Sequence, residues 1–279
     1  MRILVLFDTF VEHFLNMNAK EYIKYLLSIE SYSFSVDEIS KATDGTANSL
    51  KFELHRLSEK GEVINLRKGF YLIITPRYST SKKIPIQLYC EKLFKYLNRS
   101  YYIGLFSAAK IHGASHQQVQ RDYLITEQPK FNDISKNTID IRFFTTRNWP
   151  DKNIQLKKSD AGIYKISSPA LTIVDLIHHQ TKLGGINRML ATIEELAEEL
   201  TSADMEELLD WYPNKSTLQR FGFLLEELEI NENFQELIYG NLKSSKFFPV
   251  LLSPKSKEKA GAVDNRWKVD VNVKLESDL

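Results

Sequence analysis

The chain has 279 residues, a length that corresponds to about two domains. Hydrophobic residues make up 43% of it and aromatic residues 11%, which excludes a disordered chain. The 37 Lys+Arg and 36 Asp+Glu give a formal net charge of +1, and this balance excludes both a uniformly basic, histone-like protein and a strongly acidic one.

The charge is unevenly distributed along the sequence. Residues 18–85 carry a net charge of +3, residues 86–160 of +5 and residues 243–279 of +3, whereas residues 161–242 carry −9. The net charge near zero therefore results from basic blocks and an acidic block that cancel. If these charges segregate on the folded surface, we expect the basic side to face phosphate and the acidic side to face away from it.

The start of the chain and its cysteine content indicate a cytoplasmic protein. Cys90 is the single cysteine, so an internal disulfide and a cysteine-based zinc cluster are excluded, which points to a reducing compartment. The apolar run of residues 3–7 ends at Asp8 and is too short for a membrane span or a signal-peptide core. We expect residues 1–16 to be an extension upstream of Met17, or alternatively a short amphipathic arm that packs on the body.

Three helices are expected next. Apolar side chains fall on one face of residues 19–29. Ser35 and Glu38 form a capping box that begins a second helix. A third helix begins near Thr46 and ends before Gly61, with apolar residues at helical spacing. The expected core stripe of this third helix is Ala47, Leu50, Leu54 and Leu57.

A strand, a basic turn and a second strand follow these helices, at residues 63–66 and 70–74. Three helices and a hairpin in this order are typical of a winged helix-turn-helix, so we predict a DNA-binding domain over residues 17–76. A winged helix that binds a protein is the alternative. Residues 18–74 carry eight basic and eight acidic groups, so DNA binding would rely on local geometry.

The third helix is the expected recognition helix, whose exposed face enters the major groove. The candidate DNA-binding residues on it are Thr46, Asn48, Ser49, Lys51, His55 and Arg56. Asn suits adenine, while Thr, Ser and Lys suit phosphates or base edges. Phe52 suits a thymine methyl group, or alternatively packs on the hairpin. Further candidates for the DNA backbone or the minor groove are Arg67 and Lys68 in the hairpin turn and Arg77, Lys82 and Lys83 after it.

The remainder is predicted to be a linker at residues 77–85 and an α+β domain at residues 86–279. We expect this domain to consist of a small sheet with a helical bundle inserted before its last strands. The expected helices are residues 86–97, 104–112, a helix begun by Ser168 and Pro169, then 186–200, 203–211, 216–228 and 232–242. The expected strands are residues 122–126, 138–146, 162–166, 247–252 and 267–273.

Motifs for catalysis, metal binding or cofactor binding are not convincing. His112 and His116 have helical spacing, but a glycine separates them and the glutamate of a zinc-protease motif is missing. G-x-S-x-G, P-loop and G-x-G-x-x-G motifs do not occur. Asp270 lies on an expected strand, but Asn272 stands where a nuclease core needs a second carboxylate. We therefore predict no catalytic residues, no metal and no cofactor.

A run of acidic residues without an intervening basic residue stands out in the acidic segment. It consists of Glu194, Glu195, Glu198, Glu199, Asp204, Glu206, Glu207 and Asp210. These side chains form either the solvated faces of two surface helices or a surface that repels DNA or docks on a basic partner.

The predicted winged helix is followed by several distinctive blocks of sequence. They are YYIGLFSAAKIHGA at 101–114, HQ at 116–117, SPALTIVDL at 168–176, GGINR at 184–188 and NRWKVDVNV at 265–273. Together with the winged helix, these blocks resemble the AbiEi antitoxins of abortive-infection toxin–antitoxin systems, and the resemblance covers roughly residues 18–279.

This resemblance implies a bacterial, cytoplasmic, non-enzymatic antitoxin in a phage-defence system. Such proteins are encoded next to an AbiEii-type nucleotidyltransferase-like toxin, and in a type IV system the two need not form a stable complex. The N-terminal winged helix would bind inverted repeats of double-stranded DNA in its own promoter and repress it, and the C-terminal domain would carry the antitoxin activity. The expected partners are DNA and the toxin, with no membrane.

Two alternatives to an antitoxin stay open from the sequence. One is a stand-alone winged-helix transcriptional regulator without a toxin partner. The other is a nucleic-acid-processing enzyme whose C-terminal domain is nuclease-like and whose winged helix only delivers it to its substrate.

Overall fold

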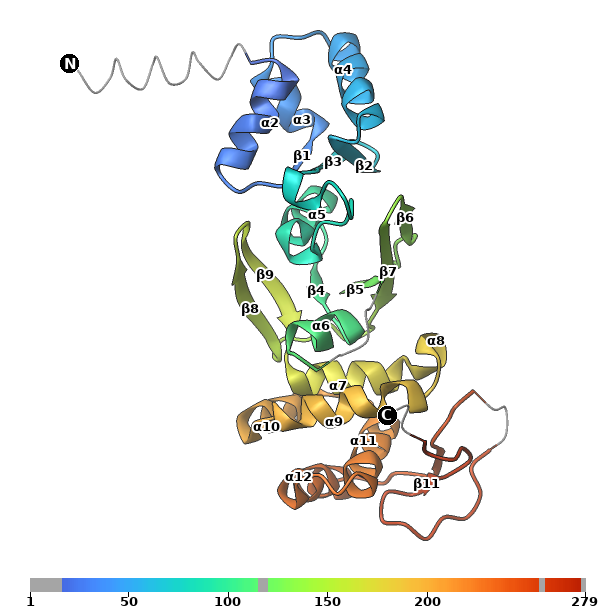
Figure 1. The fold of residues 1–279 in the computed structure, drawn as a ribbon. Coiled ribbons are helices and arrows are strands. Elements are labelled where there is room, and N and C mark those ends of the chain that lie inside the picture. Colours follow the sequence, from blue (N-terminus) through green and yellow to red (C-terminus); the bar gives the residue numbers. More distant parts are fainter. Residues whose placement is uncertain (1–16, 115–119, 256–258, 277–279) are drawn as a thin grey trace, which may run out of the picture. The chain divides into compact units, whose positions relative to one another are not determined.

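The computed structural model describes residues 17–114, 120–255 and 259–276. The expected extension at residues 1–16 and the candidate metal ligand His116 lie outside these ranges. The described residues form eleven α-helices and several sheets, so the predicted α+β class is confirmed (Figure 1). None of the described helices has the length and the apolar composition needed to cross a membrane.

The described strands form three sheets, with the orders β1-β3-β2, β6-β7-β5-β4-β9-β8 and β10-β11. The last two strands, β10 (Val250–Leu251) and β11 (Val269–Asp270), pair in parallel with each other. The expectation that they complete the sheet of the C-terminal domain is therefore wrong. The order of strands along the sequence does not determine which strands pair with each other.

The chain folds into two compact units. Unit 1 consists of the described residues up to Tyr101, together with Pro129–Phe143 and Leu156–Tyr164. Unit 2 consists of Tyr102–Gln128, Phe144–Gln155 and the described residues from Lys165 onward. Strands β4, β7, β8 and β9 each continue along the chain from one unit into the other. The domain boundaries expected at residues 76 and 85 stay a prediction.

Unit 1 begins with three capped helices, α2 (Ala19–Ser28), α3 (Val36–Ala42) and α4 (Ala47–Glu59). The predicted capping box of α3 is present, because the Ser35 hydroxyl accepts the Glu38 N–H and the Glu38 carboxylate accepts the Ser35 N–H. The side chain of Thr46 caps the start of α4, where the sequence placed the beginning of this helix. Such caps satisfy backbone donors that the first turn leaves unpaired.

A three-stranded antiparallel sheet packs with these helices. Strand β3 (Phe70–Ile73) lies between β1 (Ser33–Ser35) and β2 (Val63–Arg67). In α4, the predicted core residues Leu50, Leu54 and Leu57 are buried, but Ala47 is exposed. Ala47 occupies the first helical position, so its side chain lies beyond the end of the core that the later turns cover.

The rest of unit 1 is built around an aromatic cluster. The predicted helix over residues 86–97 is divided into a 3₁₀ turn, η2 (Ile86–Leu88), and α5 (Cys90–Leu97), because Tyr89 leaves the helical conformation. Phe94 on α5 stacks on Tyr101 with 4.5 Å between ring centroids and meets Phe143 edge-on. The short elements η1 and β6 complete this unit, at Pro76–Tyr78 and Ile134–Lys136.

Unit 2 combines strand residues with most of the helices. Its first elements, some shared with unit 1, are β4 (Tyr101–Ile103), α6 (Leu105–Ile111), β5 (Asp122–Thr126), β7 (Ile139–Thr145), β8 (Ile154–Ser159) and β9 (Gly162–Ser167). Its later helices are α7 (Pro169–His178), α8 (Gln180–Leu183), η3 (Asn187–Met189), α9 (Leu190–Glu198), α10 (Ser202–Trp211), α11 (Lys215–Glu227) and α12 (Glu232–Lys243). Most of these elements were predicted to within a few residues, but β4, β8 and α8 were not, and neither was β6 of unit 1.

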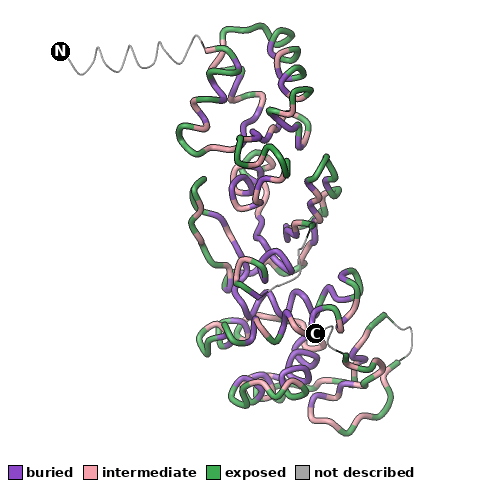
Figure 2. The backbone as a smooth tube through the Cα atoms, in the orientation of Figure 1, coloured by how far each residue is buried: buried purple, intermediate pink, exposed green. Residues whose placement is uncertain are grey.

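Helix α7 is the centre of unit 2. Ser168 caps it and Pro169 occupies its first turn, as predicted. Every residue from Pro169 to Ile177 is buried, and α6, α9, α10 and α11 pack around the helix (Figures 1 and 2). A helix that is covered on all sides needs no polar face, which explains its nearly continuous apolar sequence.

The end of the chain is anchored on α11 by Trp267. Its fully buried ring lies against Gly222, and its Nε1–H donates to the Glu226 carboxylate at 2.6 Å. The neighbouring Arg266 donates to the same carboxylate at 2.7 Å. These contacts hold the segment that leads into β11.

Candidate functional site

Two regions of the molecule are candidates for function, the exposed face of α4 in unit 1 and a pocket in unit 2. The predicted residues Thr46, Asn48, Ser49, Lys51, His55 and Arg56 are all exposed on α4. Phe52 is 67% exposed, so it does not pack on the hairpin. The helix therefore presents a polar, partly basic face with one exposed aromatic ring, which suits a nucleic-acid groove.

Two of these residues also have local contacts within α4. The Thr46 hydroxyl accepts the Ser49 N–H at 3.2 Å and so caps the helix. The Nδ1 atom of His55 lies 3.7 Å from the Glu59 carboxylate, an exposed contact that is an ion pair only when the imidazole is protonated. Asn48, Lys51 and Arg56 are therefore the side chains on this face with the clearest potential to bind a ligand.

The two basic residues of the hairpin turn, Arg67 and Lys68, have different surroundings. Lys68 is exposed, whereas Arg67 is half-buried, donates to the Asn132 carbonyl at 3.1 Å and lies 4.8 Å above the Phe131 ring. Burial also lowers the pKa of the Arg67 guanidinium. Arg67 thus packs within unit 1, a role that the sequence did not indicate because its contact residues lie more than 60 positions away.

A tyrosine fixes the conformation of the same turn. The Tyr96 hydroxyl donates to the Lys68 carbonyl at 3.0 Å. Gly69 has a φ of +77°, and a Cβ atom there would lie 2.6 Å from that hydroxyl. The positive φ favours glycine at this position, and the hydrogen bond from Tyr96 fixes the backbone of the turn that carries Lys68.

The basic residues after the hairpin are exposed or half-buried. Arg77 is exposed and lies 5.6 Å from the Tyr78 ring. Lys82 is exposed too, and its carbonyl accepts the Thr138 hydroxyl at 2.6 Å. Lys83 is half-buried. Their predicted contribution to DNA binding stays a prediction.

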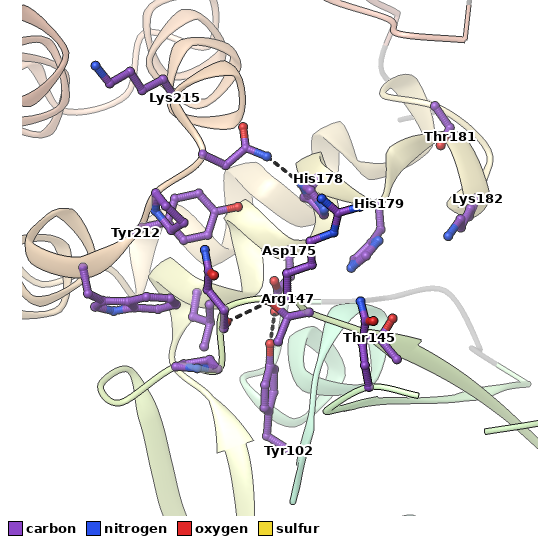
Figure 3. Close-up of a pocket in the computed structure, with 18 residues that line it drawn as sticks. Tyr102, Thr145, Arg147, Asp175, His178, His179, Thr181, Lys182, Tyr212 and Lys215 are labelled. Carbon is purple, nitrogen blue, oxygen red and sulfur yellow. Dashed lines mark hydrogen bonds between the residues drawn. The ribbon is translucent and has the colours of Figure 1, made fainter. Parts of the chain in front are cut away.

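The second candidate is a pocket of about 740 Å³ that lies entirely in unit 2 (Figure 3). Its walls come from β4, from the segment after β7, from the end of α7, from α8 and from the turn between α10 and α11. The sequence did not indicate this pocket. Its residues are scattered over more than a hundred positions and form no spaced motif, so the only signal was that Tyr102 and Asp175 occur in blocks that carry the resemblance.

A buried pair of polar side chains forms one wall of the pocket. The Tyr102 hydroxyl donates to the Oδ2 atom of Asp175 at 2.9 Å, and both residues are buried (Figure 3). Burial raises the pKa of Asp175 to about 7, although the hydrogen bond from Tyr102 opposes the shift. Burial and the neighbouring carboxylate raise the pKa of Tyr102 well above its usual value. Near neutral pH the carboxyl group can therefore either donate or accept a hydrogen bond.

Two histidines at the end of α7 lie beside this pair. The ring of His179 is buried and packs edge-on against Phe144 with 4.9 Å between centroids. Burial lowers the pKa of His179 to about 3 and that of His178 as well, so both rings are neutral at neutral pH. The Nδ1 atom of His178 lies 3.0 Å from the side-chain nitrogen of Asn214.

Aromatic and basic side chains form the rest of the pocket wall. Trp211 and Tyr212 are half-buried, and Trp211 donates to the Asn153 side chain at 2.7 Å. Arg147 and Lys182 line the pocket and are exposed. The amine of the third basic residue, Lys215, points away and bonds to Ser245 (Figure 3).

The residues considered for a metal site or a nuclease core have other surroundings in the structure. Within the described ranges, no group of three or more His, Cys, Asp or Glu residues could hold a metal ion. The residues considered for a nuclease core have structural contacts. The Asp270 carboxylate accepts the Gly261 N–H at 2.8 Å, and the Asn272 side chain bonds to the Ser253 backbone in both directions. His112 lies 2.8 Å from the Ser167 carbonyl.

The acidic run of α9 and α10 consists of residues with different surroundings. Asp204 accepts the Ala170 N–H at 2.8 Å and the Asn153 side-chain amide at 2.7 Å, so it holds the start of α7. Asp210 forms an exposed ion pair with Lys152 at 2.7 Å. The exposed members, which fit a solvated face, are Glu194, Glu198, Glu199, Glu206 and Glu207.

Comparisons with known proteins bear on the same part of the chain. Residues 102–227 match the family model described as the AbiEi antitoxin C-terminal domain. The chain is also similar to the solved RV2827C protein from Mycobacterium tuberculosis, with a TM-score of 0.62 and 14% sequence identity over 90% of each chain. At 14% identity this similarity shows a shared fold and nothing about function. No curated protein matches the sequence.

Proposed function

The chain belongs to the AbiEi antitoxin family through residues 102–227, and from this premise we propose that it represses its own operon and neutralises a nucleotidyltransferase-like toxin. The match to the antitoxin domain is the observation that carries the antitoxin assignment. The reducing compartment indicated by its single, buried cysteine favours the cytoplasm as the place of action.

The DNA-binding half of the proposal rests on unit 1. The order of α2, α3 and α4 followed by the β2–β3 hairpin supports the predicted winged helix-turn-helix, in which α4 would enter the major groove. The exposed polar face of α4 offers Asn48 and Lys51 for base edges and phosphates. Lys68 in the hairpin turn would contact the DNA backbone.

The distribution of charge supports the assignment of DNA binding to unit 1. The sequence segments of unit 1 carry a net charge of +6, and those of unit 2 carry −5. A basic unit attracts the phosphate backbone, and an acidic unit is repelled by it. Unit 1 is therefore the part expected to bind inverted repeats in the promoter.

Co-expression with the neighbouring gene tests the antitoxin half of the proposal. We expect the full chain to restore growth of cells that express an adjacent nucleotidyltransferase-like gene. Binding of the full chain to the upstream promoter DNA, compared with a scrambled duplex in a gel-shift titration, tests repression. Absence of rescue at normal protein levels would exclude the antitoxin role, and equal affinity for both duplexes would exclude a specific operator.

A further inference from the structure

The pocket of unit 2 contains none of the residues assigned above to DNA binding, and we propose that it binds a phosphorylated nucleoside. Its volume of about 740 Å³ lies within the range of pockets that hold small molecules. Its lining combines the three kinds of group that such a ligand requires, a hydrogen-bonding carboxyl group, aromatic rings and cations.

Asp175 supplies the group that would recognise the base. The residue lines the pocket and is only 5% exposed. Tyr102 occupies the Oδ2 atom, which leaves acceptor positions of the carboxylate for a ligand. The ring N–H and amino groups of a nucleobase are donors of this kind, whereas a simple inorganic anion such as pyrophosphate offers few of them.

The turn between α10 and α11 supplies the aromatic surface. The rings of Trp211 and Tyr212 lie 5.6 Å apart and nearly perpendicular to each other. The indole is held in place by its hydrogen bond to Asn153, whose amide in turn bonds to Asp204. A ring fixed in this way offers a preorganised face for stacking a base.

Two exposed cations of the pocket would bind the phosphate groups. Arg147 and Lys182 are exposed and line the pocket, and among its described lining residues the buried Asp175 is the one that is acidic. A guanidinium group can bind phosphate through two parallel hydrogen bonds. Thr145 and Asn148 on the same segment add a hydroxyl and an amide group for the ribose or the phosphates, whereas the Thr146 hydroxyl donates to the Asn148 carbonyl at 2.9 Å.

Calorimetric titration of the full chain tests the proposal. The probes are the four ribonucleoside triphosphates, their nucleosides and inorganic pyrophosphate. We expect at least one triphosphate to bind with a stoichiometry of one, about tenfold or more tighter than its nucleoside and than pyrophosphate. If no triphosphate binds more tightly than about 1 mM, or if pyrophosphate binds equally well, the proposal is wrong.

Two double variants test whether the triphosphate binds in the pocket. The double variant Arg147→Ala/Lys182→Ala should lower affinity for the triphosphate about tenfold or more and leave affinity for the nucleoside nearly unchanged. A matched control removes two exposed cations of unit 2 that do not line the pocket, as Lys110→Ala/Lys255→Ala, and should bind like the native chain. Equal losses in both double variants would show a general charge effect and overturn the assignment.

A further variant tests whether the Asp175 carboxylate contacts the base. Asp175→Asn preserves the shape of the side chain but replaces one acceptor oxygen by a donor, so affinity for the triphosphate should fall while affinity for pyrophosphate stays the same. A melting temperature at or above that of the native chain shows that the fold of the variant is intact. Unchanged triphosphate binding would remove Asp175 from the site. Because these titrations contain no toxin and no promoter DNA, they are independent of the proposed antitoxin and repressor roles.

Discussion

Among single residues, Asp175 and His179 make the stability of unit 2 depend on pH in opposite senses. The pKa of Asp175 is about 7 in the folded chain and near 4 in an unfolded one, so the folded state binds the extra proton between these values. Stability from this group therefore falls as the pH rises from about 4 to 7. The pKa of His179 is lowered to about 3, so stability falls as the pH drops below about 6.5.

Replacing Asp175 separates its contribution to the pH dependence of stability from that of His179. Asp175→Asn cannot ionise, so the variant should gain stability relative to the native chain as the pH rises from about 4 to 7, by as much as ~4 kcal/mol. Urea unfolding at several pH values across this window measures the difference. Asp151→Asn, at an exposed carboxylate of the same unit, is the control and should show a flat difference. A flat difference for Asp175→Asn would contradict the raised pKa.

On the exposed face of α4, Asn48 and Lys51 should affect DNA binding in different ways. Asn48→Ala should cost about 1–3 kcal/mol on promoter DNA and little on random DNA, because a base contact is lost. Lys51→Ala should weaken binding to both and lower the salt slope by about one, because a phosphate contact is lost. Gel-shift titrations at several salt concentrations, with Lys110→Ala in unit 2 as control, distinguish the two; identical profiles would reject these assignments.

The sequence predicts which side chains of α4 are exposed, but it does not predict which side chains meet across the fold. The exposure of Asn48, Lys51 and His55 followed from helical periodicity, because local geometry alone decides which face carries Leu50 and Leu54 into the core. The packing of Arg67 on Phe131 and the pairing of Tyr102 with Asp175 did not follow. Both depend on residues more than 60 positions apart, which only the tertiary fold brings together.

At the scale of elements, α10 shows that one acidic residue in a solvated run can support a neighbouring helix. Asp204→Ala should destabilise the chain by about 1–3 kcal/mol, because the Ala170 N–H and the Asn153 amide lose their acceptor. Glu206→Ala, on the exposed face of the same helix, should change stability by less than about 0.5 kcal/mol. Denaturant unfolding compares them, and equal effects would place Asp204 among the solvated acids.

The packing of α11 against the C-terminal segment provides a second test at this scale. A Cβ atom at Gly222 would overlap the Trp267 ring, so Gly222→Ala should destabilise the chain by about 3 kcal/mol or release the tryptophan. A Cβ atom at Gly240 on α12 would have no neighbour within 4 Å, and Gly240→Ala should stabilise the chain by up to about 1 kcal/mol. Thermal unfolding and tryptophan fluorescence measure both; a stabilising Gly222→Ala would contradict this packing.

Elements with strong local signals were predicted well, and elements fixed by tertiary pairing were not. The helix begun by Ser168 and Pro169 has a cap, a proline and an unbroken apolar run, and it lies where these signals place it. Strands β1, β4 and β6 have only three residues each, too few to establish an alternating pattern. The partners of β10 and β11 likewise depend on long-range pairing that the sequence does not encode locally.

For the whole molecule, the net charge of +1 is the sum of two units of opposite sign. The chain segments that form unit 1 bring together basic residues from three separate stretches, and the acidic helices belong to unit 2. The sequence blocks suggested this contrast, but the two later segments of unit 1 could be assigned to it only from the fold. If unit 1 binds DNA and unit 2 acts against the toxin, the two activities should be separable by mutation.

A double variant on α4 tests this separation in cells. Lys51→Ala/Arg56→Ala should raise expression from a promoter fused to a reporter by about tenfold or more, because two phosphate or base contacts are lost. The same variant should still restore growth when the toxin gene is expressed from an unrelated promoter, because the antitoxin domain is unaltered. Lys110→Ala/Lys255→Ala carries the same charge change in unit 2 and should keep repression. Loss of rescue by the α4 variant at an unchanged protein level would mean that toxin neutralisation also requires the DNA-binding face.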